Sequence, residues 1–198
     1  MGMVLGLVAI EDENIAKVLA DPPLIWKVVA PEDPDMYEAE RGEQNVSWFS
    51  KLFGKKSEAT RDTADIGQPV EETELDKSWH GIHYLLTKTA WEGEPPLNFI
   101  ILGGQEVGEI DVGYGTARAF RSDAVQEINS ALGEITNETL RERFDPGDMM
   151  KLEIYPEIWD RDPNDDDTFG YCAEYFDDLK GFVGRTADRH LGMIIYIS

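Results

Sequence analysis

Apolar runs at both ends of the chain predict two buried strands. Residues 3–10 and 191–197 are short and rich in Val, Leu and Ile, and acidic residues follow the first run from Glu11 onward. Short continuous apolar runs bounded by charged or turn residues fit strands that are covered on both faces. Residues 97–102 and 116–120 predict two further strands.

Helical spacing of apolar residues predicts several helices between these strands. Ile15, Val18 and Leu19 recur at i, i+3 and i+4 after an acidic first turn, and Pro22 ends that segment. Residues 75–86 form the clearest helix of the sequence. The other predicted helices are 23–29, a helix capped by Ser122 that runs to Leu132, a helix capped by Asn137 that runs to Phe144, a short turn or helix from Asp145, and 168–188.

The order of these elements predicts an α+β fold. Strands alternate with helices, and both the first and the last element are strands. A small mixed β-sheet that includes the N- and C-terminal strands, packed with several helices, is the economical arrangement. A chain of 198 residues corresponds to one domain, so we expect a single domain over 1–198.

Residues 31–74 differ in composition from the rest of the chain. Acidic residues, Gly, Ser and Thr dominate there, and we expect a variable loop or insertion. An island at 46–56 carries apolar residues at helical spacing and three lysines. It is either an amphipathic turn that docks or touches a membrane, or a loop that Trp48 and Phe53 anchor to the core. The second interpretation is favoured, because two helical turns are marginal alone.

The charge balance restricts the partners of the protein. Forty Asp and Glu residues outnumber 18 Lys and Arg, for a net charge of −22. Such a surface repels phosphate groups, so we expect no binding to nucleic acid or to an anionic membrane. It attracts basic proteins and divalent cations, although an acidic surface also serves solubility alone. Hydrophobic residues still make up 41% of the chain, which is enough for a packed core.

Cysteine usage and the N-terminal run bear on the compartment. Cys172 is the single cysteine, so neither a disulfide nor a thiolate metal cluster can form within the chain. This usage is typical of a reducing compartment. The apolar N-terminal run is ten residues long and lacks a basic flank, unlike a signal peptide or a membrane span. We therefore expect a cytoplasmic protein.

Two histidines provide the first candidate chemistry. On the predicted helix over 75–86, His80 and His83 lie three residues apart and share one face. Two imidazoles there can bind a metal, or one can act as a general base near neutral pH. No third ligand stands at a recognisable spacing, so no metal is assigned. The simpler interpretation is that both rings bond to backbone carbonyls beneath the glycine-rich segment.

That segment, 103–115, invites comparison with a phosphate-binding loop. Its spacing differs from Gly-x-Gly-x-x-Gly, and it holds acids and no Lys, so phosphate is a poor match. A tight turn that frames a pocket is predicted instead, with Tyr114 and Arg118 projecting their polar ends. Arg118 can anchor a carboxylate in bidentate fashion, or it can neutralise one of the chain's own acids.

A third candidate segment, 155–167, contains Trp159 and Asp160. Asp160, Asp162 and Asn164 alternate as at the start of a calcium loop, but the later positions lack the Gly and the bidentate Glu that such a loop requires. Carboxylates that precede a long helix, near the positive end of its dipole, explain the segment more simply.

Several short motifs of these segments occur together in one known group of proteins. They are Met1-Gly2-Met3, the segment 75–86 with its Trp-His-Gly-Ile-His core, Gly103-Gly104, Gly113-Tyr114-Gly115, Ala117-Arg118, Tyr155-Pro156-Glu157-Ile158-Trp159-Asp160 and Tyr175-Phe176. With these motifs the chain resembles the YfbM-like family, a group of bacterial domains of unknown function. The resemblance covers nearly the whole chain except 31–74, and it implies a compact α+β domain and no activity, since the family has no established one.

The sequence favours a non-catalytic acidic binding protein, an inhibitor or immunity-type partner of a basic protein. Neither Gly-x-Ser-x-Gly nor another complete catalytic set is present, so no catalytic residue and no cofactor is assigned. A metal-dependent protein that uses the two histidines and an acid is a third hypothesis. The alternative to the first is a small-molecule-binding domain or enzyme, whose candidate pocket gathers His80, His83, Tyr114, Arg118, Trp159 and Asp160.

Overall fold

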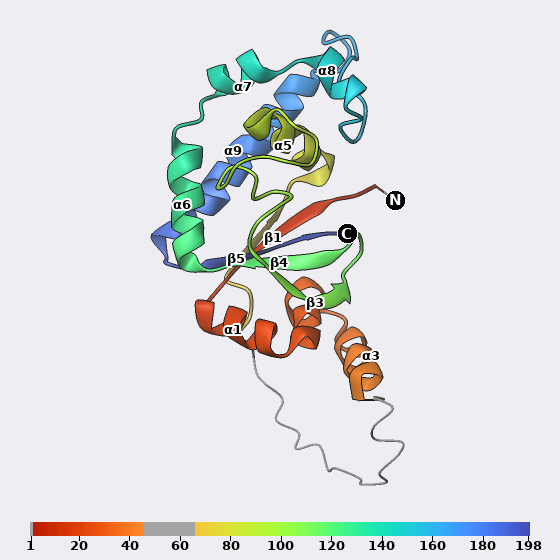
Figure 1. Ribbon diagram of the computed structural model, residues 1–198, viewed down its shortest axis with the longest axis vertical. Helices are drawn as coiled ribbons and strands as arrows, with labels where there is room; N and C mark the ends of the chain where they lie inside the picture. Colours follow the sequence, from red (N-terminus) through yellow and green to blue (C-terminus); the bar gives the residue numbers. More distant parts are fainter. Residues whose placement is uncertain (1, 46–65) are drawn as a thin grey trace.

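A β-sheet of five described strands organises the fold. The computed structural model describes residues 2–45 and 66–198, and its strands lie in the order β2–β1–β5–β4–β3 (Figure 1). The first and last strands of the chain are neighbours at the centre of this sheet, and the predicted α+β fold is confirmed. The strands are β1 (Leu5–Ile10), β2 (Glu71–Glu74), β3 (Gln105–Asp111), β4 (Thr116–Phe120) and β5 (Gly192–Ile197).

All strand pairs in the described part of the chain are antiparallel, so the prediction of a mixed sheet was wrong. β1 pairs with β5 from Leu5 opposite Ile197 to Ile10 opposite Gly192. The reason lies in the connection between β4 and β5. Its helices return the chain to the end of the sheet where β4 finishes, so that Phe120 pairs with Met193. A parallel pair would need a crossover to the opposite end.

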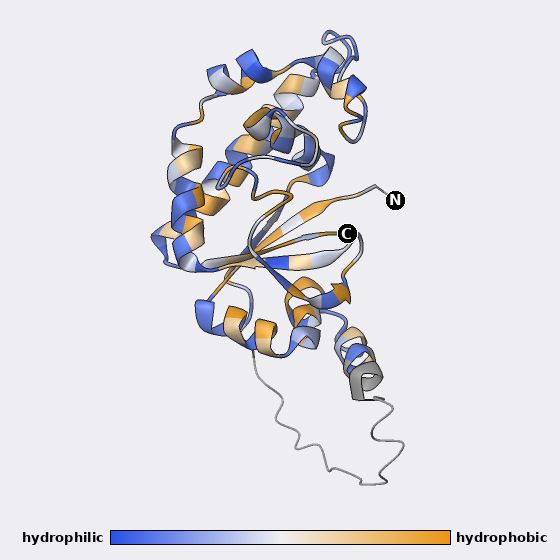
Figure 2. Cartoon of the chain, viewed as in Figure 1, coloured by the Kyte–Doolittle hydropathy of each residue, from blue (hydrophilic) through white to orange (hydrophobic). Residues whose placement is uncertain are grey.

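Helices cover both faces of the sheet (Figures 1 and 2). The side chains of α1 and α2 pack on one face, and those of α5, α6 and α9 pack on the other. The described helices are α1 (Asp12–Ala20), η1 (Pro22–Ile25), α2 (Trp26–Val29), α3 (Pro34–Asn45), η2 (Asp76–Ser78), α5 (Trp79–Thr87), α6 (Ser122–Gly133), α7 (Asn137–Arg143), α8 (Pro146–Lys151) and α9 (Thr168–Asp188).

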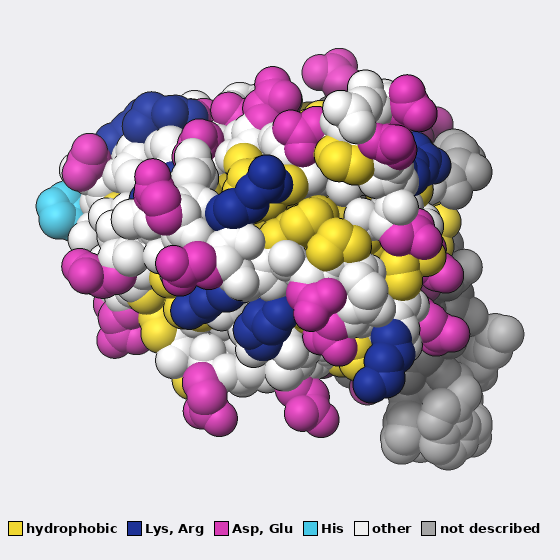
Figure 3. Space-filling model, turned by 90° about the horizontal axis from the view of Figure 1, so that it is seen from above, with side chains coloured by type: hydrophobic (Ala, Val, Ile, Leu, Met, Phe, Trp, Pro, Cys, Tyr) yellow, Lys and Arg dark blue, Asp and Glu magenta, His cyan; other side chains and the backbone are white. Residues whose placement is uncertain are grey.

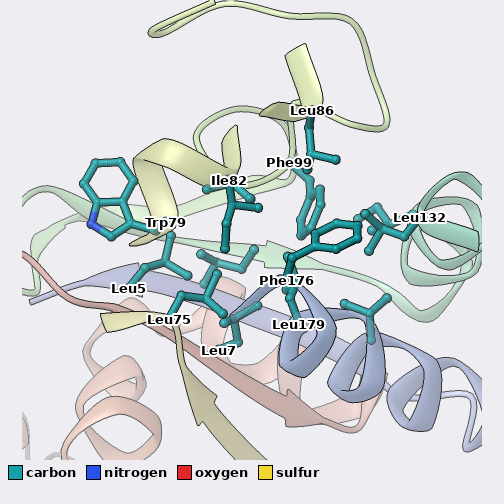
Figure 4. Close-up of a cluster of buried hydrophobic side chains, with 14 of the residues drawn as sticks. Leu5, Leu7, Leu75, Trp79, Ile82, Leu86, Phe99, Leu132, Phe176 and Leu179 are labelled. Carbon is teal, nitrogen blue, oxygen red and sulfur yellow. The ribbon is translucent and has the colours of Figure 1, made fainter. Parts of the chain in front are cut away.

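The sheet therefore separates two hydrophobic cores. In the larger one, Leu5 and Leu7 of β1 meet Trp79 and Ile82 of α5 and Phe176 of α9 (Figure 4). The smaller core takes the alternate residues of the same strands, such as Val8 and Ile194, against α1 and α2. Because successive side chains of a strand point to opposite faces, a strand covered on both faces has no polar side. This explains the two continuous apolar runs of the sequence.

The predicted strand over residues 97–102 is wrong. These residues form consecutive turns, and the place beside β4 belongs to β3, which arises from the glycine-rich segment. Phe99 and Ile100 are buried in the larger core. The apolar run thus reflects packing against the core, which hydropathy alone does not distinguish from a strand.

Two predicted helix caps are also wrong. Ser122 is the first residue of α6, and its N–H and hydroxyl both donate to the carboxylate of Asp12, at 2.9 and 2.8 Å. Thr136 rather than Asn137 caps α7, because the Thr136 hydroxyl accepts a hydrogen bond from the N–H of Thr139 at 3.2 Å. The short helix predicted from Asp145 is present as α8, and Asp145 caps it, with its carboxylate accepting from the N–H of Asp148.

The segment 31–74 contains regular structure at both of its ends. Both α3 and β2 lie entirely within it. The island at 46–56, with Trp48 and Phe53, lies outside the described residues. Among the helices that the structure describes, none has the length and apolar character needed to cross a membrane.

Asp12 joins the start of α6 to the start of α1, so its carboxylate holds two layers together. We expect Asp12→Ala to lower the free energy of unfolding by about 1–2 kcal/mol, because the backbone N–H and the hydroxyl of Ser122 both lose their acceptor. Chemical denaturation measures the change. Glu127→Ala, an exposed site on α6, removes the same charge and serves as control. Equal effects of the two substitutions would contradict this role.

Candidate functional site

Helix α5 carries the two candidate histidines, and it is buried along eight consecutive residues from Trp79 to Leu86. His80 lies within hydrogen-bond distance of two backbone groups. Its Nδ1 accepts from the N–H of Tyr155 at 3.0 Å, so its Nε2 carries the proton and donates to the carbonyl of Ala90 at 2.8 Å. Burial lowers the pKa of His80, and the Ala90 carbonyl opposes that shift. His80 is thus a neutral ring with both nitrogens occupied.

His83 is fully buried, and neither of its ring nitrogens has a hydrogen-bond partner among the described residues. Burial is the main cause that lowers its pKa to about 4, and the neighbouring His80 and Arg118 act in the same direction. The nearby Glu92 backbone raises the pKa, although no hydrogen bond of normal geometry forms there. Neither ring reaches the surface. The prediction that both rings bond to backbone carbonyls is confirmed for His80, whereas the ring nitrogens of His83 have no hydrogen-bond partner among the described residues.

The structure does not place Trp159 and Asp160 with the histidines at an open pocket. Trp159 is 1% exposed, and its Nε1 donates to the carbonyl of Ile154 at 2.6 Å. Its ring packs against Gly81, where a Cβ atom would stand 2.4 Å from Trp159 and 2.8 Å from the sulfur of Cys172. Asp160 is exposed. Gly81 is therefore explained by the close approach of two core side chains.

The carboxylates that follow Asp160 are bonded locally. Asp162 accepts hydrogen bonds from the N–H and the side chain of Asn164, at 2.9 and 2.8 Å, and Arg161 pairs with Asp166 at 2.6 Å. Asp167 caps α9 by accepting from the N–H of Gly170 at 2.9 Å. Across residues 2–45 and 66–198, no three His, Cys, Asp or Glu side chains come together as metal ligands would.

Tyr114 and Arg118 do meet, at a surface depression of about 250 Å³. We call it the aromatic depression, because Trp91 and Tyr114 on its rim are 56% and 53% exposed. Glu106 also lies on the exposed rim, and Ile195 is buried at the floor. The residues that line the depression are Trp91, Ile101, Glu106, Tyr114, Thr116, Arg118, Ile195, Tyr196 and Ile197.

Tyr114 stands on a tightly bonded turn between β3 and β4. Asp111 Oδ1 accepts from the N–H groups of Gly113 and Gly115, at 2.9 and 3.0 Å, and these bonds lower the pKa of Asp111. Gly113 has a φ of +146°, and a Cβ there would stand 2.8 Å from the backbone of Ser198. The N–H of Tyr114 donates to the carbonyl of Ile197 at 2.9 Å. These bonds fix the backbone that carries the exposed tyrosine ring.

Trp91 stands on the ring of His80. The two ring centroids are 4.4 Å apart, and the carbonyl of the preceding residue, Ala90, is held by His80. His80 thus positions Trp91. Sequence reasoning did not single out Trp91, although a large aromatic residue within a polar loop rich in Thr, Glu, Gly and Pro is a signal that could have identified it.

Arg118 holds the loop that precedes β3. Its guanidinium donates to the carbonyls of Ile100 and Leu102, both at 2.6 Å, and of Phe99 at 2.9 Å. Burial lowers its pKa to about 10, and the opposing charge of Glu106, its partner in the β3–β4 register, raises it. Arg118 therefore neither pairs closely with an acid among the described residues nor points freely to solvent, because its guanidinium N–H groups donate to backbone carbonyls.

The family of the chain can be stated from its whole length. A protein-family model, described as a domain of unknown function (DUF1877), matches residues 1–196. The chain belongs to this family. Among solved structures, YfbM from Escherichia coli, a protein of unknown function, matches with a TM-score of 0.64 and 15% sequence identity, over 98% of this chain and 99% of that chain. No curated protein matches.

The resemblance to the YfbM-like family is thus confirmed. At 15% identity the likeness to YfbM concerns the fold alone. Because the DUF1877 family brings no activity with it, a function for this member has to be argued from the geometry of its surface.

Gly81 of this DUF1877 chain provides a test of the packing beneath α5. We expect Gly81→Ala to destabilise the protein by about 1–3 kcal/mol, because the new methyl group overlaps Trp159 and Cys172. Gly184→Ala in α9 is the matched control. A Cβ there stands 3.7 Å from Asn129, so helix propensity should stabilise this variant by up to about 1 kcal/mol. Thermal unfolding distinguishes the two, and an equally stable Gly81→Ala would refute the packing.

His83 predicts a pH dependence of stability. Its folded-state pKa of about 4 lies below its ordinary value of 6.5, so below pH 6.5 the unfolded chain takes up a proton that the folded chain refuses. The free energy of unfolding should therefore decrease as the pH is lowered. Between pH 7 and pH 5, His83 should contribute about 2 kcal/mol to this decrease.

The variant His83→Phe should show a shallower fall over that range in urea denaturation at each pH. A packing effect of the new ring shifts the whole curve equally, whereas loss of the titration changes its slope. An unchanged slope would show that His83 titrates alike in both states.

Proposed function

We propose that the protein is a non-catalytic acidic binding protein, an inhibitor or immunity-type partner of a basic protein, and that the aromatic depression is its docking surface. One observation carries the proposal. The exposed large hydrophobic residues of the described chain are Met36, Trp91, Leu102 and Tyr114. Two of these line the depression, and the carbonyl of a third, Leu102, bonds to Arg118 at its wall.

Trp and Tyr are the residues that most often dominate the binding energy of protein interfaces. The backbone that carries Tyr114 is held by the Asp111 turn before any partner arrives, and the Trp91 ring packs on His80. Preorganisation of this kind avoids part of the entropy cost of association. An exposed aromatic pair on a rigid support therefore favours binding over a purely structural role.

The charge around the depression supports a basic partner. Glu106 lines it, and Glu92, Glu94, Glu109 and Asp111 are exposed on the same loops and strand. With a net charge of −22, the protein attracts a cationic partner over long range, which speeds association and makes it sensitive to salt.

Basic side chains are also present at another end of the molecule. Figure 3 looks onto the end that carries α7 and α8, where Lys and Arg side chains border a hydrophobic area and acidic side chains lie around the edge. Arg141 lies over the ring of Phe169 there, at 4.4 Å. At the depression, in contrast, Arg118 is the single basic residue among the described lining residues.

The alternative is a small-molecule-binding domain or enzyme at the same depression. Its support is the volume of about 250 Å³ and the Nε of Arg118, which makes no hydrogen bond within the described residues. It loses His80 and His83 as acid–base groups, however, because both rings are buried behind the loop. No catalytic residue is assigned, and a cytoplasmic location remains a prediction from the single buried cysteine, Cys172.

Affinity capture from a native lysate tests the proposal. We expect the tagged protein to capture a stoichiometric basic protein at low salt and to release it at high salt. The double variant Trp91→Ala/Tyr114→Ala should reduce capture at least tenfold, because it removes both exposed rings. Met36→Ala removes an exposed hydrophobic side chain on α3 and should leave capture unchanged.

Capture that both variants retain equally would refute the depression as the docking surface. Absence of any salt-sensitive basic partner would refute the binding function itself, and a screen of small anionic compounds against wild type and Arg118→Met would then test the alternative.

A further inference from the structure

The rim of the aromatic depression has the parts of a site for one cationic side chain. Trp91 and Tyr114 expose about half of their surface, and Glu106 lines the same depression and is exposed to solvent. Aromatic faces attract cations through the ring quadrupole, and Trp does so most strongly. A carboxylate beside two rings adds direct charge pairing to that attraction.

Glu106 is available for such a partner. It makes no hydrogen bond and no ion pair within the part of the chain that the structure describes, although Arg118 lies opposite it in the β3–β4 register. The guanidinium of Arg118 instead donates its hydrogen bonds to backbone carbonyls of the 99–103 loop. The rim therefore holds a carboxylate with no close ion pair among the described residues, while the Arg118 guanidinium already has backbone partners.

The shape of these groups selects among cations. A guanidinium is planar, so it stacks on an aromatic face and at the same time presents two N–H groups to one carboxylate. An ammonium is a compact and strongly hydrated point charge, which gains less from flat rings. An apolar side chain in the depression would remove water from the Glu106 carboxylate without replacing its hydrogen bonds, at a cost in free energy.

We propose that the aromatic depression receives an arginine side chain of the partner protein, with the guanidinium between Trp91 and Tyr114 and paired to the Glu106 carboxylate. This inference rests on the proposed binding function and adds the chemistry of the residue that is recognised. Arg118 limits the affinity of this site, since its own positive charge is part of the lining of the depression.

Titration of the full-length protein with short peptides tests the inference. The probes are acetylated and amidated Gly-Arg-Gly, Gly-Lys-Gly and Gly-norleucine-Gly, and the readout is the indole N–H signal of Trp91 in a nitrogen-edited NMR spectrum. The Trp91 signal is identified by its loss in Trp91→Phe. We expect the Arg peptide to shift this signal with an affinity at least threefold above that of the Lys peptide, and the norleucine peptide to leave it in place.

Two variants on the same strand separate a specific contact from general attraction. Glu106→Gln keeps the size and hydrogen-bonding capacity of the side chain but removes its charge, and it should weaken the Arg peptide at least fivefold. Glu109→Gln removes an equal charge from an exposed residue of β3 that does not line the depression, and it should have an effect below twofold.

Equal effects of Glu106→Gln and Glu109→Gln, equal binding of the Arg and norleucine peptides, or no shift of Trp91 with any probe would each overturn the inference. The captured partner distinguishes this failure from failure of the proposed function. A partner that still requires Trp91 and Tyr114, yet binds Glu106→Gln as tightly as wild type, would leave the function standing and remove arginine recognition from it.

Discussion

Burial of β1 and β5 on both faces is the constraint on which the rest of the structure depends. The two strands pair along their full length, so their side chains must be covered from two sides at once. The helices α1 and α2 meet this requirement on one face, and α5, α6 and α9 meet it on the other. Since α5 lies between the sheet and the loop that follows it, α5 has no face toward water, and its polar side chains must find partners inside the protein.

The histidines of α5 show what this burial does to residues that look reactive in a sequence. His80 satisfies both nitrogens with backbone groups and supports Trp91 on its ring, whereas His83 is left without a partner. Arg118 likewise forms hydrogen bonds inside the protein. Its guanidinium donates to backbone carbonyls of the 99–103 turn, which do not pair with a strand. His80 and Arg118 thus shape the loops around the aromatic depression. In the proposal, the groups that face a partner are their neighbours Trp91, Tyr114 and Glu106.

The electrostatics of the depression follow from the same arrangement. Arg118 is half-buried and its guanidinium is turned toward backbone oxygens, so the acids around it are not neutralised by contact. The Glu106 carboxylate lies exposed in this depression, and the exposed rings of Trp91 and Tyr114 line it as well. A surface of this kind combines long-range attraction of a cationic partner with a short-range aromatic contact, and the two contribute to association rate and to affinity respectively.

The sequence by itself determined the elements whose pattern is dictated by burial: the two apolar end strands, the helices α1, α5 and α9, and the acidic surface. It also determined that a motif of Trp79, His80 and His83 belongs to one helix. Only the tertiary structure decided that residues 97–102 form turns, that all described strand pairs are antiparallel, and that Tyr114 and Arg118 meet while both histidines and Trp159 are enclosed. The physical reason is that periodicity reports how much of a segment is covered, whereas the partner that covers it, and the hydrogen bonds left for its polar groups, come from segments distant in the chain.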